Sequence, residues 1–187
     1  MRVLFVTNMW PDEVRPWHGA YVKAQADSLT AVGIDLELVT MRGYASRSHY
    51  LRAAAKVGAL NRNCPFDVVH AHYGHSGVVA RLQLRAPLVL SYCGSDLLAT
   101  PTTNGSRTLR SRIEAQVFRQ LAWVADATIT KSKEMERRLS PSRQAVNHVI
   151  PNGVDMERFR PIPGTRREHG SAGARATATS CSWAIPT

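Results

Sequence analysis

The residues best suited to chemistry stand in short polar loops, each directly after an apolar run. The first of these loops contains Gly19, which precedes a run of apolar residues at helical spacing. A glycine at a helix start lets an anion approach free backbone N–H groups, and the helix dipole favours negative charge there. Gly19 is therefore a candidate phosphate contact, although a tight turn would explain it as well. The spacing G-x-G-x-x-G is absent, which disfavours an ordinary dinucleotide site.

A second loop is rich in histidine, with His70, His72 and His75 around Tyr73. Alternate residues of a strand point to the same side, so we expect His70 and His72 on one face, with one buried and the other at the strand end. Imidazole can donate, accept or carry a proton near neutral pH, which suits contact with a sugar hydroxyl or a phosphate. No H-E-x-x-H helix accompanies these residues, and we predict no metal site.

The third loop offers a thiol, backbone N–H groups, a hydroxyl and a carboxylate. Cys93 could be considered as a nucleophile, but a catalytic thiol needs a lowered pKa and a base beside it. A small packed thiol is the better interpretation of Cys93. Gly94, Ser95 and Asp96 together predict contacts to a polar ligand.

Two more loops complete the set of candidate ligand contacts, with Lys131 in one and Asn152 and Gly153 in the other. Lys131 follows a strand-like run, and Ser132 is placed to cap the helix expected after it. The sequence Pro151-Asn152-Gly153 predicts a sharp turn, which turn chemistry alone explains.

The elements that must position these loops alternate along the chain. A strand at 2–7, a helix at 19–32 stopped by Gly33, and a strand at 34–39 form a βαβ unit. The pattern then predicts further strands at 67–71, 87–91, 125–130 and 146–150, and helices at 76–84, 107–124 and 133–139. These elements predict an α/β fold, a Rossmann-like open, mostly parallel sheet with helices on both faces. In such sheets ligands bind at the carboxyl ends of the strands, where every loop above lies.

Length and composition restrict the class of protein. The 187 residues suffice for one well-buried domain. No apolar run near the start is long enough for a signal peptide or a membrane span, and three cysteines without paired spacing form no disulfide framework, so we expect a cytoplasmic protein. We predict a folded domain over 1–161. The segment 162–187 lacks periodicity and is interpreted as a disordered tail or the product of a frameshift.

The net charge of +10 raises the question of an anionic partner. Residues 42–62 hold five basic residues and no acidic one, and their apolar residues could line one side of a helix. Such a helix can lie at the inner face of an anionic membrane or bind a phosphorylated acceptor. The alternative is that its apolar side packs on the sheet. No recognition helix, RNP aromatic pair or zinc finger is present, so we expect no nucleic acid partner.

Taken in order, these motifs resemble glycosyltransferase family 4, the retaining family with two Rossmann-like domains that face a cleft (the GT-B architecture). The resemblance covers residues 2–161. Its matching stretches are Val3-Leu4-Phe5-Val6-Thr7 with Gly19, Asp67-Val68-Val69-His70-Ala71-His72-Tyr73, Tyr92-Cys93-Gly94-Ser95-Asp96-Leu97, Ala125-Asp126-Ala127 with Lys131-Ser132, and Ile150-Pro151-Asn152-Gly153-Val154-Asp155 with Phe159.

The resemblance implies an N-terminal, acceptor-side half of an enzyme that transfers a sugar from a nucleotide-sugar donor to an acceptor hydroxyl. Gly19 would approach the donor diphosphate, while Tyr73 and the loop 94–96 would face the reacting sugars. The family often has a histidine where this chain has Cys93, so its aligning role is lost or passes to His72. The half that binds most of the donor is missing, so the resemblance predicts an inactive fragment that needs no metal or other cofactor. The alternative is a non-catalytic module that binds a phosphate, a nucleotide or a protein partner.

Overall fold

The computed structural model describes residues 1–42, 46, 48–63, 65–83, 85–154 and 156. The chain divides into two units, Met1–Gly153 and Val154–Thr187, and the first contains all the helices and strands named below. The predicted boundary at residue 161 and the predicted tail 162–187 lie outside the described residues.

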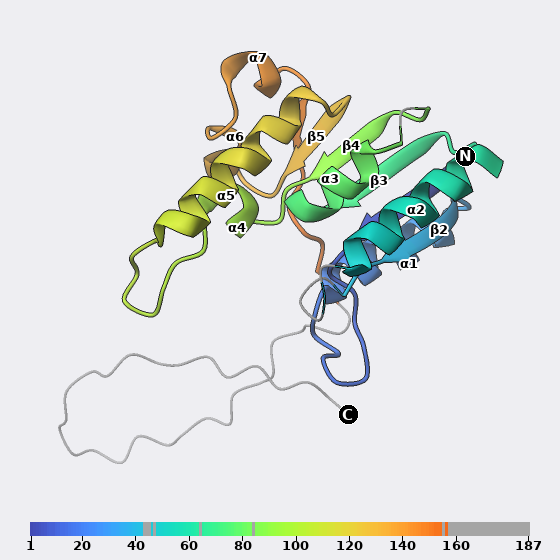
Figure 1. Cartoon of the computed structure of the whole chain (residues 1–187), viewed down its shortest axis with the longest axis horizontal. Coiled ribbons are helices and arrows are strands. Elements are labelled where there is room, and N and C mark those ends of the chain that lie inside the picture. Colours follow the sequence, from blue (N-terminus) through green and yellow to red (C-terminus); the bar gives the residue numbers. More distant parts are fainter. Residues whose placement is uncertain (43–45, 47, 64, 84, 155, 157–187) are drawn as a thin grey trace, which may run out of the picture. The chain divides into compact units, whose positions relative to one another are not determined.

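Six strands form one sheet in the order β2-β1-β3-β4-β5-β6, and all neighbouring pairs are parallel (Figure 1). The sequence prediction of six strands is confirmed, with bounds shifted by two residues at most. From β1 the chain first adds β2 on one side. It then crosses back to add β3 and the later strands on the other side, so the switch point of the topology lies between β1 and β3. The strands are β1 (Arg2–Thr7), β2 (Asp35–Thr40), β3 (Val68–His72), β4 (Leu88–Ser91), β5 (Ala127–Thr130) and β6 (Asn147–Val149).

The helices follow the predicted pattern with local differences. Gly33 ends the first helix as expected, because at φ 85° its N–H reaches the Thr30 carbonyl. Ser132 caps the short helix after β5 by accepting the Met135 N–H at 3.3 Å. Two four-residue helices, α4 and α7, were not predicted, since a single turn has no periodicity to detect. The helices are α1 (Ala20–Ala31), α2 (Ser48–Asn63), α3 (Gly74–Arg81), α4 (Ser95–Leu98), α5 (Leu109–Gln120) continued by the 3₁₀ turn η1 (Leu121–Trp123), α6 (Lys133–Glu136) and α7 (Pro141–Gln144).

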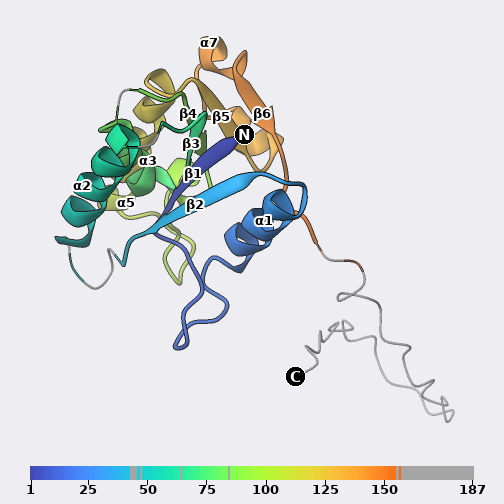
Figure 2. The same cartoon turned by 90° about the vertical axis from the view of Figure 1, so that its right-hand side faces the viewer.

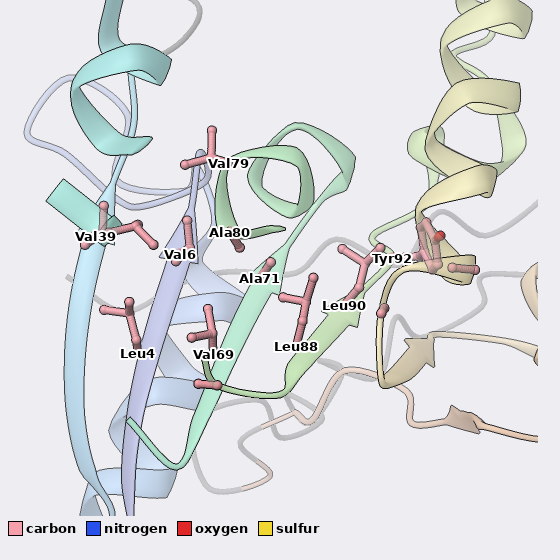
Figure 3. Close-up of a cluster of buried hydrophobic side chains, with 14 of the residues drawn as sticks. Leu4, Val6, Val39, Val69, Ala71, Val79, Ala80, Leu88, Leu90 and Tyr92 are labelled. Atoms are coloured by element: carbon pink, nitrogen blue, oxygen red, sulfur yellow. The ribbon is translucent and has the colours of Figure 1, made fainter. Parts of the chain in front are cut away.

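The larger hydrophobic core lies between the sheet and the helices α2 and α3, together with the turn η1 that continues α5 (Figure 3). Every second strand residue contributes, so Leu4 and Val6 of β1 face this layer together with Leu88 and Leu90 of β4. Tyr92 is fully buried and donates its hydroxyl hydrogen to the Phe118 carbonyl at 2.9 Å. A buried tyrosine therefore fixes α5 against the end of β4.

The opposite face of the sheet is covered differently. Figure 2 shows α1 on that side, away from α2 and α3. The small core beneath α1 joins Val3 and Phe5 of β1 to Val22 and Ala26 of α1. Beyond β3 this face carries half-buried residues such as Val89 and Ile129. The prediction of helices on both faces is confirmed, but most of the core lies on one of them.

The basic segment 42–62 forms most of α2. Its apolar side packs into the larger core through Ala53 and Val57, with Tyr50 partly buried beside them. Of the two interpretations, the structure therefore supports packing on the sheet for that side of the helix. Leu51, Arg52 and Lys56 point to solvent.

Candidate functional site

The start of α1 requires a glycine. Gly19 has φ 73° and ψ 20°, the left-handed region, and a Cβ there would overlap the backbone of Met9. The tight-turn interpretation of Gly19 thus holds. In the described part of the chain, neither the Gly19 nor the Tyr21 N–H donates to a protein acceptor. The helix start therefore also has the open donors that an anion would use.

The loop after β3 is strained at Tyr73. This residue has φ 78° and ψ 149°, a region that glycine alone adopts easily. Its N–H donates to the Ser91 carbonyl at 2.9 Å, and its hydroxyl lies 3.1 Å from the Ser95 hydroxyl. The strained backbone thus directs the phenol toward the loop that follows β4.

That loop is organised around Asp96, whose side chain is buried. Its carboxylate accepts the Cys93 N–H at 3.0 Å and the Gly94 N–H at 2.8 Å. Burial raises the pKa of Asp96 to about 6, against the opposing effect of the backbone hydrogen bonds from Gly94 and Cys93. Both carboxylate oxygens accept from the backbone, so Asp96 shapes this loop, and its predicted contact with a ligand stays a prediction.

Cys93 is a protonated thiol at neutral pH. Burial, and secondly the negative charge of Asp96, raises its pKa to about 12. Its Sγ lies 3.6 Å from the Ser91 carbonyl oxygen. These surroundings support the packed-thiol interpretation and argue against a nucleophile.

Two residues from other elements complete the cluster. Tyr21 of α1 is half-buried, and burial followed by its interaction with Cys93 raises the pKa of its hydroxyl. Lys131 is half-buried at the end of β5, where burial lowers the pKa of its ammonium and Cys93 and Asp96 act in the opposite direction. Sequence reasoning included Lys131 but missed Tyr21, because nothing in a helical pattern distinguishes a site tyrosine from a packing one. The cluster therefore joins α1 with the loops after β3, β4 and β5.

The two strand histidines share one face, as predicted, but neither reaches the open edge. Their rings stack with centroids 4.2 Å apart, and both are buried. His70 Nε2 lies 2.8 Å from the Ser91 hydroxyl, and His72 Nε2 lies 3.2 Å from Gln25 Oε1. Burial lowers the pKa of His70 to about 3 and the pKa of His72 well below its ordinary value. His72 is the last residue of β3 and so lies at the strand end as expected, but it is buried there against Gln25. Its predicted catalytic role stays a prediction.

The last predicted site residues stand apart from this cluster. Asn152 and Gly153 are exposed and follow the hydrogen bond from the Ile150 N–H to the Thr130 carbonyl. Within the described residues, no backbone hydrogen bond joins them to Tyr73 or Lys131. They form the end of the first unit.

In the ranges that the structure describes, no group of three His, Cys, Asp or Glu side chains could hold a metal ion. A shallow cavity of about 590 Å³ lies beside the loop after β1, lined by Pro11–Arg15 and Arg42. It lies on the β2 side of β1, whereas the polar cluster lies on the β3 side. The polar cluster is the stronger candidate site, because it occupies the switch point where sheets of this kind bind ligands.

An open parallel sheet with polar loops gathered at its switch point defines a ligand-binding α/β domain of Rossmann type. The family model of Glycosyltransferase Family 4 matches residues 2–158, and the chain belongs to this family. The resemblance drawn from the motifs is thereby confirmed.

Relatives agree with this assignment. The chain is 18% identical to TuaC of Bacillus subtilis (strain 168), a protein assigned as a teichuronic acid biosynthesis glycosyltransferase, and the match covers 90% of this chain and 54% of TuaC. The chain thus spans about half the length of this relative.

Two solved structures share the fold. Sucrose-phosphate synthase (tll1590) from Thermosynechococcus elongatus matches 86% of this chain and 50% of its own, with a TM-score of 0.63 and 15% identity. Anabaena Alr3699/HepE, solved in complex with UDP and glucose, matches 87% of this chain and 47% of its own, with a TM-score of 0.52 and 19% identity. At these identities the likeness concerns the fold, which is one Rossmann-like half of a GT-B glycosyltransferase.

Proposed function

We propose that this chain is the acceptor-side half of a retaining glycosyltransferase that uses a nucleotide-sugar donor. The observation that carries the proposal is the cluster at the switch point, where the open start of α1 and the Lys131 ammonium border one polar edge. Backbone N–H groups and an ammonium are the donors that bind a diphosphate. The complex of HepE with UDP and glucose makes a nucleoside diphosphate the natural probe.

Within this proposal the residues have distinct roles. The N–H groups at Gly19 would approach the donor diphosphate, and Lys131 would balance its charge. Tyr73 and Ser95, joined by their hydroxyls, would contact the reacting sugars. Asp96 would act indirectly as a positioning residue, since its oxygens hold the loop backbone.

The proposed chemistry needs no covalent bond to this half. The Cys93 thiol is protonated and the Asp96 carboxylate is turned inward, so neither is suited to attack a sugar. We expect this half to orient the acceptor and the donor sugar, and to exclude water once a second domain closes over it. For the same reason we expect no turnover by the 187-residue chain alone, and no metal requirement for donor contact.

The test is a titration of the ¹⁵N-labelled chain with UDP in the presence of EDTA, followed by amide chemical shifts. We expect shifts at Gly19–Tyr21, Tyr73 and 93–96. Lys131→Gln should weaken the affinity about tenfold, the effect of losing one charge-assisted contact. Lys133→Gln is the matched control, because the Lys133 ammonium is exposed and paired with Glu136 at 2.9 Å.

Shifts spread over the basic helices, or an equal loss in the Lys133 variant, would contradict the proposed site. Release of UDP from UDP-glucose by the purified chain would contradict the expected lack of turnover. Tight binding of UDP by a stable monomer would instead favour the alternative, a non-catalytic nucleotide-binding module.

A further inference from the structure

The helical layer opposite α1 carries most of the excess positive charge. Residues 42–113 contain ten Lys or Arg residues and two acidic ones, Asp67 and Asp96, which leaves +8 of the chain's +10 in this stretch. Neither of these two residues offsets that charge at the outer surface, where the acidic residue of α5 is Glu114, which pairs with Arg110 at 3.0 Å. Asp96 is buried, and Asp67 accepts the Arg2 backbone N–H at the amino end of the sheet.

A row of aromatic rings joins the three helices of this layer. Tyr50 of α2 stacks on His75 of α3 with centroids 5.5 Å apart, and His75 meets Phe118 of α5 at 4.7 Å. Gly74 lies directly against the Phe118 ring, where a Cβ would overlap it. The layer is therefore packed as one unit, and Figures 1 and 2 show α2, α3 and α5 on the same side of the sheet.

Helix α5 is apolar on two opposite sides. Its inner side buries Ser111, Ala115 and Phe118. Successive residues of a helix are 100° apart, which places Ile113 opposite the buried side. Leu109 and Val117 are each four residues from Ile113, so they lie on the same outer side of the helix. All three are exposed, Ile113 to 55% and Val117 to 54%. No described element covers this outer stripe.

The same layer exposes further apolar side chains beside basic ones. Exposed Leu51 lies next to Arg52 and Lys56 on α2, and exposed Leu82 follows Arg81 at the end of α3. On α2 and at the end of α3, an exposed aliphatic side chain therefore lies beside a cation. We name the outer side of α2, α3 and α5 the basic apolar face.

We propose that the basic apolar face docks on an anionic phospholipid membrane. Cations attract the acidic headgroups, and the aliphatic stripe of α5 enters the boundary between headgroups and acyl chains. This inference extends the contact expected for residues 42–62 to α5, and it is independent of the proposed sugar transfer. Nucleic acid fits less well, because an aliphatic stripe offers neither hydrogen bonds to phosphates nor a surface on which bases stack. In the described ranges no helix is long and apolar enough to cross a bilayer, so the proposed contact is with the surface.

The experiment is co-sedimentation of the chain with vesicles of phosphatidylcholine and phosphatidylglycerol at equal amounts, compared with phosphatidylcholine alone. We expect binding to the anionic vesicles. Binding should be at least tenfold weaker to phosphatidylcholine alone, or at 0.5 M salt, where the screening length falls to about 4 Å. Ile113→Ser with Val117→Ser should weaken binding about tenfold, and Arg52→Gln with Lys56→Gln by a similar factor.

Two controls lie away from this face. Val14→Ser removes an exposed aliphatic side chain from the loop after β1, and Lys23→Gln removes a cation from α1. Neither should change binding, and circular dichroism should confirm that every variant is folded. Absence of vesicle binding, or binding unaffected by the α5 variant, would overturn the proposal. Salt-sensitive binding to duplex DNA that exceeds vesicle binding would replace it with a nucleic acid surface.

Discussion

The carboxyl ends of β3 and β4 lie side by side, and polar groups are buried at both. The two ends stabilise these polar groups in opposite ways. In the last three residues of β3, the imidazoles of His70 and His72 are neutral, because burial lowers the pKa of each. After β4, the Asp96 carboxylate is satisfied by two backbone N–H groups that it fixes in place. The β3 end therefore depends on staying uncharged, whereas the β4 end depends on hydrogen bonds to an acceptor.

Backbone conformation separates the two ends as well. The residue at positive φ after β3 is Tyr73, which pays a steric cost to present its phenol. After β4 it is Gly94, which adopts φ 136° without a side chain. The β3 end therefore supplies side-chain contacts and the β4 end supplies a shaped backbone, and three measurements test this division.

The largest expected effect is loss of stability in acid through the β3 end. The folded pKa of His70, about 3, and that of His72 lie below the unfolded value of 6.5, so the unfolded chain binds more protons once the pH falls below 6.5. Stability should fall from there toward pH 3, by up to about 2.7 kcal/mol per pH unit for two protons. Asp96 acts in the opposite direction between pH 3.8 and about 6, because its folded pKa is raised.

Urea unfolding at several pH values measures this slope. His72→Gln should reduce it by about one proton, while His148→Gln, at an exposed position, should leave it unchanged. A profile identical in the wild type and the His72 variant would mean that the β3 end is not protected by its neutral imidazoles.

The second effect is expected at the β4 end. Asp96→Asn removes the charge that two backbone N–H groups contact, and it places an NH2 donor where Oδ2 now accepts the Cys93 N–H at 3.1 Å. The folded state should lose about 3 kcal/mol, the range for a broken hydrogen bond to a buried charge. Thermal and urea unfolding at pH 7 measure it, with Asp27→Asn as the control, because Asp27 is exposed and paired with Lys23. Equal stability of the two variants would show that the loop does not depend on the carboxylate.

The smallest effect tests the glycine itself. Gly94→Ala should destabilise by about 2 kcal/mol, because no atom lies within 4 Å of the added Cβ and the cost is that of the backbone conformation alone. Gly153→Ala, also in open space but without a positive φ, should change stability by less than about 0.5 kcal/mol. A neutral Gly94→Ala would mean that the loop shape is set elsewhere.

Sequence patterns predicted the fold well and the site only in part. Alternation and helical spacing predicted six parallel strands and the long helices, because both depend on which residues are apolar. The loops at the carboxyl edge were predicted because parallel strands end together. The burial of His72 and the inward turn of Asp96 were not, since each depends on neighbours distant in sequence, such as Gln25 for His72.

By itself the sequence determined the family, the alternation of strands and helices and the positive charge of residues 42–113, all of which follow from residue types in order along the chain. Only the tertiary structure decided which polar groups face a ligand and which face the protein. It turned Asp96 toward the backbone, buried both strand histidines and brought Tyr21 against Cys93. It also joined α2, α3 and α5 into one layer with an exposed aliphatic stripe. Those outcomes depend on packing between elements, which fixes direction and burial only when the sheet and its helices are assembled.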